Sequence, residues 1–324
     1  MAFGLSRRMR RWMIVNVLLV LGIAACGETP SQTAPPASVD TPGAATQRAL
    51  PQIEGLVAYV SRYDVAETVR RLSDGLSAAG GVVAATVDHA ANARSAGAEL
   101  APTTVIVGGV PRAGTPLIAA RQQAGVLLPQ KYLVWQDEAG TVRLAYNAAD
   151  YLTQVVDADA AAGQLLAEGS ARLAAAATGT ERPSSTGPAP SGGDYLITLS
   201  SDADPATTLR RLQEAVAAKG LTPAAVVDHA KAAATIGTTL RPTTVLLVGN
   251  PAAGTPLIQA NQSMGIDLPL RFLIWQGEDG TTRVSYPDIT RLAQRHGIPS
   301  GSQPVTMVSN GAAAFASAAA GQPG

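Results

Sequence analysis

Cysteine is nearly absent from this chain of 324 residues, which contains only Cys26. A disulfide within the chain needs two cysteines and a cysteine-based zinc cluster needs several, so both are excluded. Aromatic residues make up only 4% of the chain, so its cores must be built mainly from small aliphatic side chains. Because the chain has neither a disulfide nor a cysteine-bound zinc, its stability must come from the packing of these side chains.

Charge is also scarce, and neither sign dominates. Charged residues are 15% of the chain, and 24 basic residues balance 24 acidic ones. Proteins that bind DNA or RNA neutralise phosphates with a surplus of Lys and Arg, so this balance argues against a nucleic-acid partner.

The amino terminus has the pattern of an export signal. Four arginines precede an apolar run over residues 13–25, which is too short to cross a bilayer comfortably. The run ends in Leu21-Gly22-Ile23-Ala24-Ala25-Cys26, which resembles the lipobox of bacterial lipoproteins. We expect residues 1–26 to be a lipoprotein signal peptide, with lipid attached at Cys26; the alternatives are an uncleaved anchor or an ordinary signal peptide with a chance cysteine.

The segment after Cys26 is rich in Pro, Thr, Ala and Ser. Residues 27–51 contain too few large apolar side chains to form a core, so they are expected to be a disordered tether. The predicted location is the bacterial cell envelope, with the protein lipid-anchored to the membrane and facing the periplasm or exterior.

The rest of the chain consists of two copies of one domain in tandem. Val87-Asp88-His89-Ala90 returns 140 residues later as Val227-Asp228-His229-Ala230, and these two segments hold two of the three histidines. The predicted domains are residues 52–177 and 194–321, and a Pro-, Ser- and Gly-rich linker, 178–193, separates them. A period of this length indicates a tandem domain rather than a repeat array.

Hydrophobic periodicity predicts the same elements in each copy. In the first copy we expect strands at 56–60, 82–87, 103–107, 131–136 and 141–146, with the last two forming a hairpin. Helices are expected after the Asp64 cap, after the Asp-His pair, from Thr115-Pro116 to about Ala124, and from Ala148 onward. This order favours an α+β fold with a mostly antiparallel sheet.

Both copies resemble the DUF302 family. The resemblance rests on the Asp-His pair, Leu100 with Pro102, Gly109 with Pro111, Leu128-Pro129 and the Trp135 hairpin, and on their counterparts in the second copy. The family's Gly-Asn-Pro element is intact as Gly249-Asn250-Pro251, but it is Gly-Val-Pro in the first copy. The resemblance implies two compact α+β domains, each with a helix packed on a curved sheet as in TATA-box-binding-protein-like folds, and it brings no established activity.

The Asp-His pairs are the sharpest candidates for chemistry. A histidine beside a carboxylate can act as acid, base or ligand near neutral pH. Neighbouring residues on a strand point to opposite faces, however, so a catalytic dyad does not follow from adjacency. The competing interpretation is that each Asp caps the next helix and each His packs or hydrogen-bonds structurally. The ligand-binding candidates are Asp88, His89, Asp228, His229, Gly249, Asn250 and Pro251.

Other kinds of site have little support. We expect no catalytic residue, metal site or cofactor, because each copy offers one histidine of the repeated pair and no cysteine. The loops at 109–116 and 249–256 precede helices, where backbone N–H groups can hold an anion, but they lack the dinucleotide fingerprint and the P-loop lysine.

The function expected from the sequence is a membrane-anchored envelope lipoprotein that binds an unidentified small molecule or envelope protein without catalysis. Its two domains are expected to pair as an internal pseudo-dimer. The alternative is an envelope enzyme or a redox or metal accessory protein that uses the Asp-His pairs.

Overall fold

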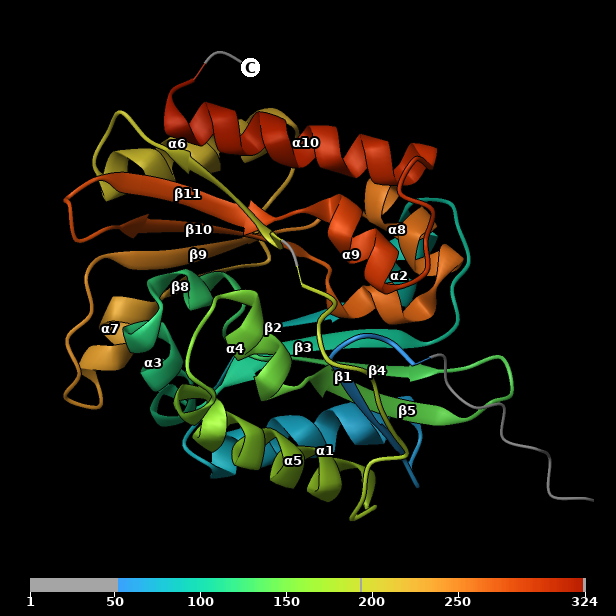
Figure 1. Ribbon diagram of the computed structural model, residues 1–324. Helices are drawn as coiled ribbons and strands as arrows, with labels where there is room; N and C mark the ends of the chain where they lie inside the picture. The colour runs from blue at the N-terminus through green and yellow to red at the C-terminus, as the bar shows by residue number, and fades with distance from the viewer. Residues whose placement is uncertain (1–51, 193, 323–324) are drawn as a thin grey trace, which may run out of the picture. The chain divides into compact units, whose positions relative to one another are not determined.

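The computed structural model in Figure 1 describes residues 52–192 and 194–322. The predicted signal peptide, Cys26 and the predicted tether lie outside the described residues. Both copies of the repeat belong to one compact unit. Among the described residues, no helix is both long enough and apolar enough to cross a membrane.

The first copy follows the predicted order of elements. Its elements are β1 (Leu56–Val60), α1 (Val65–Ala78), β2 (Val82–Asp88), α2 (His89–Ser95), β3 (Thr103–Gly109), α3 (Pro111–Ala120), the 3-10 helix η1 (Gln122–Val126), β4 (Lys131–Gln136), β5 (Val142–Asn147), α4 (Ala149–Val155), η2 (Ala160–Gly163) and α5 (Gln164–Thr178).

The second copy repeats this order after a short strand, β6 (Ser185–Thr186). Its elements are β7 (Leu196–Ser200), α6 (Pro205–Ala218), β8 (Ala225–Asp228), α7 (His229–Ala234), β9 (Thr243–Val248), α8 (Pro251–Ala260), η3 (Gln262–Ile266), β10 (Leu270–Gln276), β11 (Thr282–Pro287), α9 (Ile289–Arg295) and α10 (Gln303–Ala320).

Each copy contains one antiparallel sheet. The strand order is β2-β3-β4-β5-β1-β6 in the first sheet and β7-β11-β10-β9-β8 in the second. Helices α1 and α5 cover one face of the first sheet, and α6 and α10 cover one face of the second (Figure 1). The fold is therefore α+β, as predicted, with apolar side chains such as Leu72, Ile106 and Leu144 packed between helices and sheet.

Local sequence signals explain where most helices begin. The carboxylate of Asp64 accepts a hydrogen bond from Glu67 N at 2.7 Å, which satisfies a free N–H in the first turn of α1. Asp204 does the same for α6, accepting from Thr207 N at 3.0 Å, and Pro205 occupies the first helical position. These caps confirm the predicted starts.

One predicted helix boundary is wrong. Helix α3 begins at Pro111 and ends at Ala120, whereas the sequence pattern favoured a start at Thr115-Pro116 and an end near Ala124. Both prolines suit a first helical position, and Pro111 takes it because its missing N–H costs nothing there. Thr115 and Pro116 then lie inside the helix, and residues 122–126 form η1 instead of the last helical turn.

The predicted linker contributes to the first sheet. Strand β6 pairs with β1, with Ser184 N donating to Ala58 O at 2.7 Å and Gly187 N donating to Leu56 O at 2.8 Å. The linker thus covers the outer edge of β1. Among the described residues, no strand covers the corresponding edge of β7.

The second face of each sheet contacts the other copy. Segment η1 packs on β9 and β10 of the second copy, and η3 packs on β3 and β4 of the first. Val126 accordingly lies among Val245, Leu247 and Leu273. Each copy therefore inserts the same short segment against the other's sheet.

Candidate functional site

The two Asp-His pairs end equivalent strands, β2 and β8. The Asp88 carboxylate accepts a hydrogen bond from Ala91 N at 2.8 Å and caps α2, and Asp228 accepts from Lys231 N at 2.9 Å and caps α7. Both aspartates are exposed, whereas both histidines are buried. Within the described residues, neither aspartate is hydrogen-bonded to its neighbouring histidine, so the pairs do not form catalytic dyads.

Each histidine contacts the backbone of the other copy. The Nε2 atom of His89 lies 3.1 Å from Gly265 O, and that of His229 lies 2.9 Å from Gly125 O. A carbonyl oxygen only accepts, so each Nε2 must carry the proton and donate it. Burial lowers the pKa of both histidines to about 4, and both rings are therefore neutral at neutral pH.

The carbonyls that accept these bonds belong to glycines in η1 and η3. A Cβ on Gly125 would lie 3.2 Å from His229 Cδ2 and 2.8 Å from Leu273 Cδ1, and a Cβ on Gly265 would lie 3.3 Å from His89 Cδ2. Glycine, which has no Cβ, lets the side chains of the other copy approach the backbone of η1 and η3 this closely.

A glutamine precedes each of these glycines by three residues and also reaches the other copy. Gln122 Nε2 donates to Thr243 Oγ1 at 2.7 Å, and Gln262 Nε2 donates to Thr103 Oγ1 at 2.7 Å. These contacts were not predicted from the sequence. Their signal in the sequence is the repeated Gln-x-x-Gly spacing, offset by the same 140 residues.

We call Asp88 and His89, at the end of β2, the Asp-His corner of the first copy. A large pocket lies where this corner meets the Gly-Asn-Pro element of the second copy, residues 249–251. Its volume is about 800 Å³. Five of the seven predicted ligand-binding residues line it, namely Asp88, His89, Gly249, Asn250 and Pro251. Asp228 and His229 do not line this pocket, because they lie at the equivalent corner on the other side of the contact between the copies.

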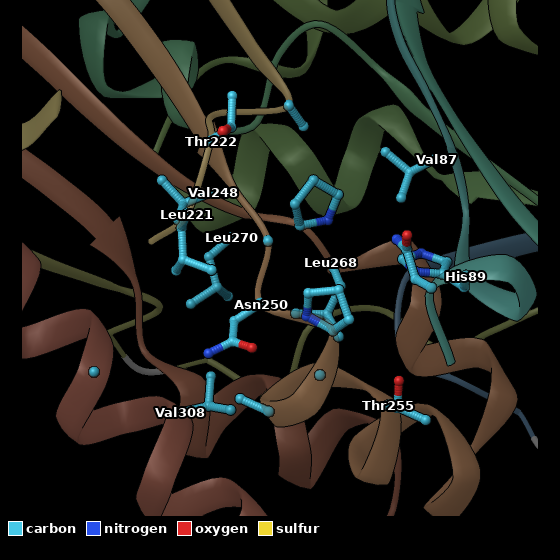
Figure 2. Close-up of a pocket in the computed structure, with 18 of the residues that line it drawn as sticks. Val87, His89, Leu221, Thr222, Val248, Asn250, Thr255, Leu268, Leu270 and Val308 are labelled. Atoms are coloured by element: carbon cyan, nitrogen blue, oxygen red, sulfur yellow. The ribbon is translucent and has the colours of Figure 1, made fainter. Parts of the chain in front are cut away.

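The walls of the pocket are mostly apolar. Figure 2 shows Leu221, Val248, Leu270 and Val308 around Asn250, with His89 and Thr255 farther along the same pocket. Helix α10 contributes Met307 and Gly311, both of which are exposed. Polar side chains are in the minority and include those of Asp88, Asn92, Lys219, Thr222 and Asn250. An apolar cavity with a few polar groups has the usual character of a small-molecule site.

The pairing of β8 with β9 in the second copy is shorter than the equivalent pairing of β2 with β3 in the first copy, and the pocket lies beside the part that is not paired. In the first copy, pairing of β2 with β3 extends to Val82 opposite Gly109. In the second copy, β8 starts only at Ala225, and Pro223 occupies the position that corresponds to Val83. Proline has no N–H to donate to a neighbouring strand. The unpaired segment contributes Leu221 and Thr222 to the pocket wall.

The Gly-Asn-Pro element also differs structurally between the copies. Asn250 caps α8, because its Oδ1 accepts from Ala252 N at 3.1 Å. Val110 occupies the same place before α3 and makes no such bond. The two loops therefore form the first turns of helices, and only the second has a side-chain cap.

The described residues contain no group of three or more His, Cys, Asp or Glu side chains arranged to hold a metal. The third histidine, His296, is buried, and its Nε2 atom lies 2.7 Å from a carboxylate oxygen of Asp267. Its other ring nitrogen, Nδ1, lies 2.7 Å from Ser263 Oγ. Both of its ring nitrogens thus have partners.

Known proteins resemble parts of this chain. Fluoride-specific ion channel FluC 1 from Brucella suis biovar 1 (strain 1330) is 40% identical over 100 residues, which are 31% of this chain and 39% of that protein. FluC 1 from Brucella abortus biovar 1 (strain 9-941) is 40% identical over 100 residues, again 31% of this chain and 37% of that protein. The chain thus spans about two fifths of the length of these relatives.

The structural comparison finds a crystal structure of an uncharacterized conserved DUF302 protein from Bacillus stearothermophilus. It shares 20% identity with this chain at a TM-score of 0.37, and the match covers 39% of this chain and 99% of the other. The family model described as "Domain of unknown function DUF302" matches twice, over residues 57–178 and 197–313. These two matches cover most of the sequence, and the chain therefore belongs to the DUF302 family as a tandem of two such domains.

Proposed function

We propose that this protein is a non-enzymatic binding module that holds a small, predominantly apolar molecule in the pocket between the Asp-His corner and the Gly-Asn-Pro element. The size and the apolar lining of this pocket are the observations that support binding. Its volume of about 800 Å³ falls within the range of small-molecule sites, and aliphatic and aromatic side chains form most of its wall. A ligand that buries apolar surface there is favoured by the hydrophobic effect.

The polar groups suggest how such a ligand is oriented. Lys219 and Thr222 come from the second copy and Asp88 and Asn92 from the first, and all four line the pocket together with many apolar residues. A molecule with an apolar body and a hydrogen-bonding end fits this distribution. The side chain of Asn250, next to the start of α8, is the central polar contact.

The two copies act in this proposal as an internal pseudo-dimer. The reciprocal bonds of His89 and His229 support it, as do the matching contacts of Gln122 and Gln262. Joining the domains in one chain holds them at a high effective concentration, so the shared pocket needs no second chain.

We further propose that the protein is a lipoprotein of the bacterial cell envelope. The arginine-rich start, the apolar run and the lipobox-like sequence at Cys26 support this location. Channel activity is not part of the proposal, because the FluC relatives match only 31% of this chain.

The alternative, an enzyme or a redox or metal accessory protein that uses the Asp-His pairs, has weaker support. The Nε2–H of each histidine already donates a hydrogen bond to a backbone carbonyl, and each aspartate caps a helix. Ligation of a metal through Nε2 would break the contact between the copies.

A pocket-filling variant tests the binding proposal. Gly311 lies on α10 and lines the pocket, and a Cβ there meets no atom within 4 Å, so Gly311→Trp adds a large ring at the pocket wall without a clash and is expected to obstruct it. Gly169→Trp on α5 is the matched control, because Gly169 also has open space and does not line the pocket. The probe is the neutral fluorescent dye N-phenyl-1-naphthylamine.

The wild type and Gly169→Trp should bind the dye saturably, and Gly311→Trp should bind it at least about tenfold more weakly, a loss of about 1.4 kcal/mol. Native mass spectrometry of the purified wild type should also detect a co-purifying apolar molecule that Gly311→Trp lacks. Equal dye binding by all three proteins would remove the pocket as the site.

A further inference from the structure

A second buried site lies between the copies, away from the apolar pocket. Lys131 on β4 and Arg271 on β10 occupy equivalent positions, and their side chains are almost completely buried, with residue exposures of 3% and 5%. Each reaches the other copy. Lys131 Nζ donates to Pro269 O at 2.7 Å, and the Arg271 guanidinium donates to the carbonyls of Leu127 and Pro129.

The carboxylate of Asp267 lines the same cavity as both cations and interacts electrostatically with each of them. It also accepts a hydrogen bond from Arg295 Nη1 at 3.2 Å and lies 2.7 Å from His296 Nε2. Within the described residues, the side chains of Lys131 and Arg271 donate hydrogen bonds to backbone carbonyls. One buried carboxylate thus faces three buried basic side chains, those of Lys131, Arg271 and Arg295, which is an excess of positive charge.

A small cavity adjoins this excess charge. It has a volume of about 30 Å³, and Lys131, Arg271, Asn147, Tyr151 and Asp267 contribute to its lining. Arg271 Nε is buried and has no hydrogen-bond partner among residues 52–192 and 194–322. Lys131 makes one hydrogen bond, although an ammonium group carries three protons. The space fits one monoatomic ion or one to two water molecules.

We propose that this cavity binds one small monovalent inorganic anion of halide size, held by Lys131 and Arg271 from the two copies. The anion adds negative charge to that of Asp267, the carboxylate in the cavity lining, and it accepts a hydrogen bond from Arg271 Nε. The site does not depend on the apolar pocket, since the two cavities share no lining residue.

The electrostatics favour an anion over water alone. Burial lowers the pKa of Arg271 to about 9 and that of Lys131 well below its usual value, because the charged forms lose their hydration, and a bound anion would stabilise those charged forms. Water can fill the hydrogen-bonding gap, but it cannot neutralise a buried charge. An anion does both, and it fastens the two copies together.

Thermal unfolding in different sodium salts tests this site. Sodium gluconate is the reference, because its anion is too large for the cavity, and chloride, fluoride and bromide are the probes at equal ionic strength. The wild type should show a saturable rise in Tm, roughly 5 °C when the halide is at a hundred times its Kd. Arg271→Met and Lys131→Met should lose this rise, whereas Arg70→Met, which removes an exposed cation, should keep it.

If the two variants fail to fold, anion binding can still be tested on the wild type by crystallography. Crystals soaked in bromide should show an anomalous scattering peak between Lys131 Nζ and Arg271 Nε. No peak there, together with the same Tm in halide and gluconate, would overturn the proposal and leave the cavity to water.

Discussion

The imidazole of His89 donates a hydrogen bond to the carbonyl oxygen of Gly265 over 3.1 Å, although 176 residues separate them in the chain. The same bond joins His229 to Gly125 at 2.9 Å in the opposite direction. The most prominent repeated motif of the sequence thus joins the two copies, and it does so twice.

Removing either imidazole should destabilise the unit that contains both copies. His89→Ala leaves a cavity and an unpaired buried carbonyl, and we expect a loss of about 2–4 kcal/mol in the free energy of unfolding, measured by urea denaturation. His229→Ala should cost a similar amount. His89→Gln should cost less, because its amide can donate. Asp88→Ala, which removes only the cap of α2, should cost about 1 kcal/mol. If Asp88→Ala proves as costly as His89→Ala, the bond between the copies is not what stabilises this corner.

Stability should fall as the pH falls through the range in which the unfolded histidines gain protons. The folded pKa values of His89 and His229 are about 4, below the ordinary value of 6.5. Between pH 6.5 and 4 the unfolded chain therefore binds protons that the folded chain does not. Each histidine then lowers the free energy of unfolding by at most about 1.4 kcal/mol per pH unit. His296, whose pKa burial also lowers, acts in the same direction.

Urea denaturation at several pH values between 7 and 5 measures this slope above the range in which most carboxylates titrate. The double variant His89→Gln/His229→Gln should show a clearly smaller slope than the wild type. Identical slopes would mean that the two histidines titrate in the folded protein as they do in the unfolded chain.

The first copy should gain stability from the cap that it lacks. Val110→Asn places at the start of α3 the side chain that caps α8 in the second copy. We expect the free energy of unfolding to rise by about 1 kcal/mol, and Asn250→Val to lower it by about the same amount. Chemical denaturation of both variants measures the two effects, and a destabilising Val110→Asn would show that packing of Val110 outweighs the cap.

Membrane attachment should depend on Cys26. In cells that make the full chain, Cys26→Ala should move the protein from the membrane fraction to the soluble fraction, because the thiol is the predicted lipid attachment site. Cys26→Ser is a second variant of similar size that should behave in the same way. Membrane association that persists in both variants would contradict lipidation at this residue.

Much of the fold was predictable because its signals are local. A short apolar, β-branched run located β1, and alternation over residues 141–146 after a turn ending at Gly140 located the β4-β5 hairpin. The caps at Asp64 and at its counterpart Asp204, 140 residues later, located the starts of two helices. The start of α3 was mispredicted because two prolines in the same segment suited the first helical position. The pairing of the linker with β1 was also missed, since two residues carry no strand periodicity of their own.

The candidate site was predictable only in part. The repeat singled out Asp88 and His89, the resemblance to the DUF302 family singled out the Gly-Asn-Pro element, and these residues line one pocket. The sequence did not indicate that the Asp-His pair of one copy faces the Gly-Asn-Pro element of the other. It also gave no sign that Lys131 and Arg271 share a buried cavity, because each alone resembles an ordinary charged residue on a strand.

The sequence by itself determined the duplication, the order of elements and the positions of the capping residues, because each depends on chain neighbours and on a fixed offset of 140 residues. Only the tertiary structure decided what those residues face. Contacts such as His89 with Gly265, and Lys131 with Pro269, depend on how two sheets pack, and side chains from distant parts of the chain set that packing jointly.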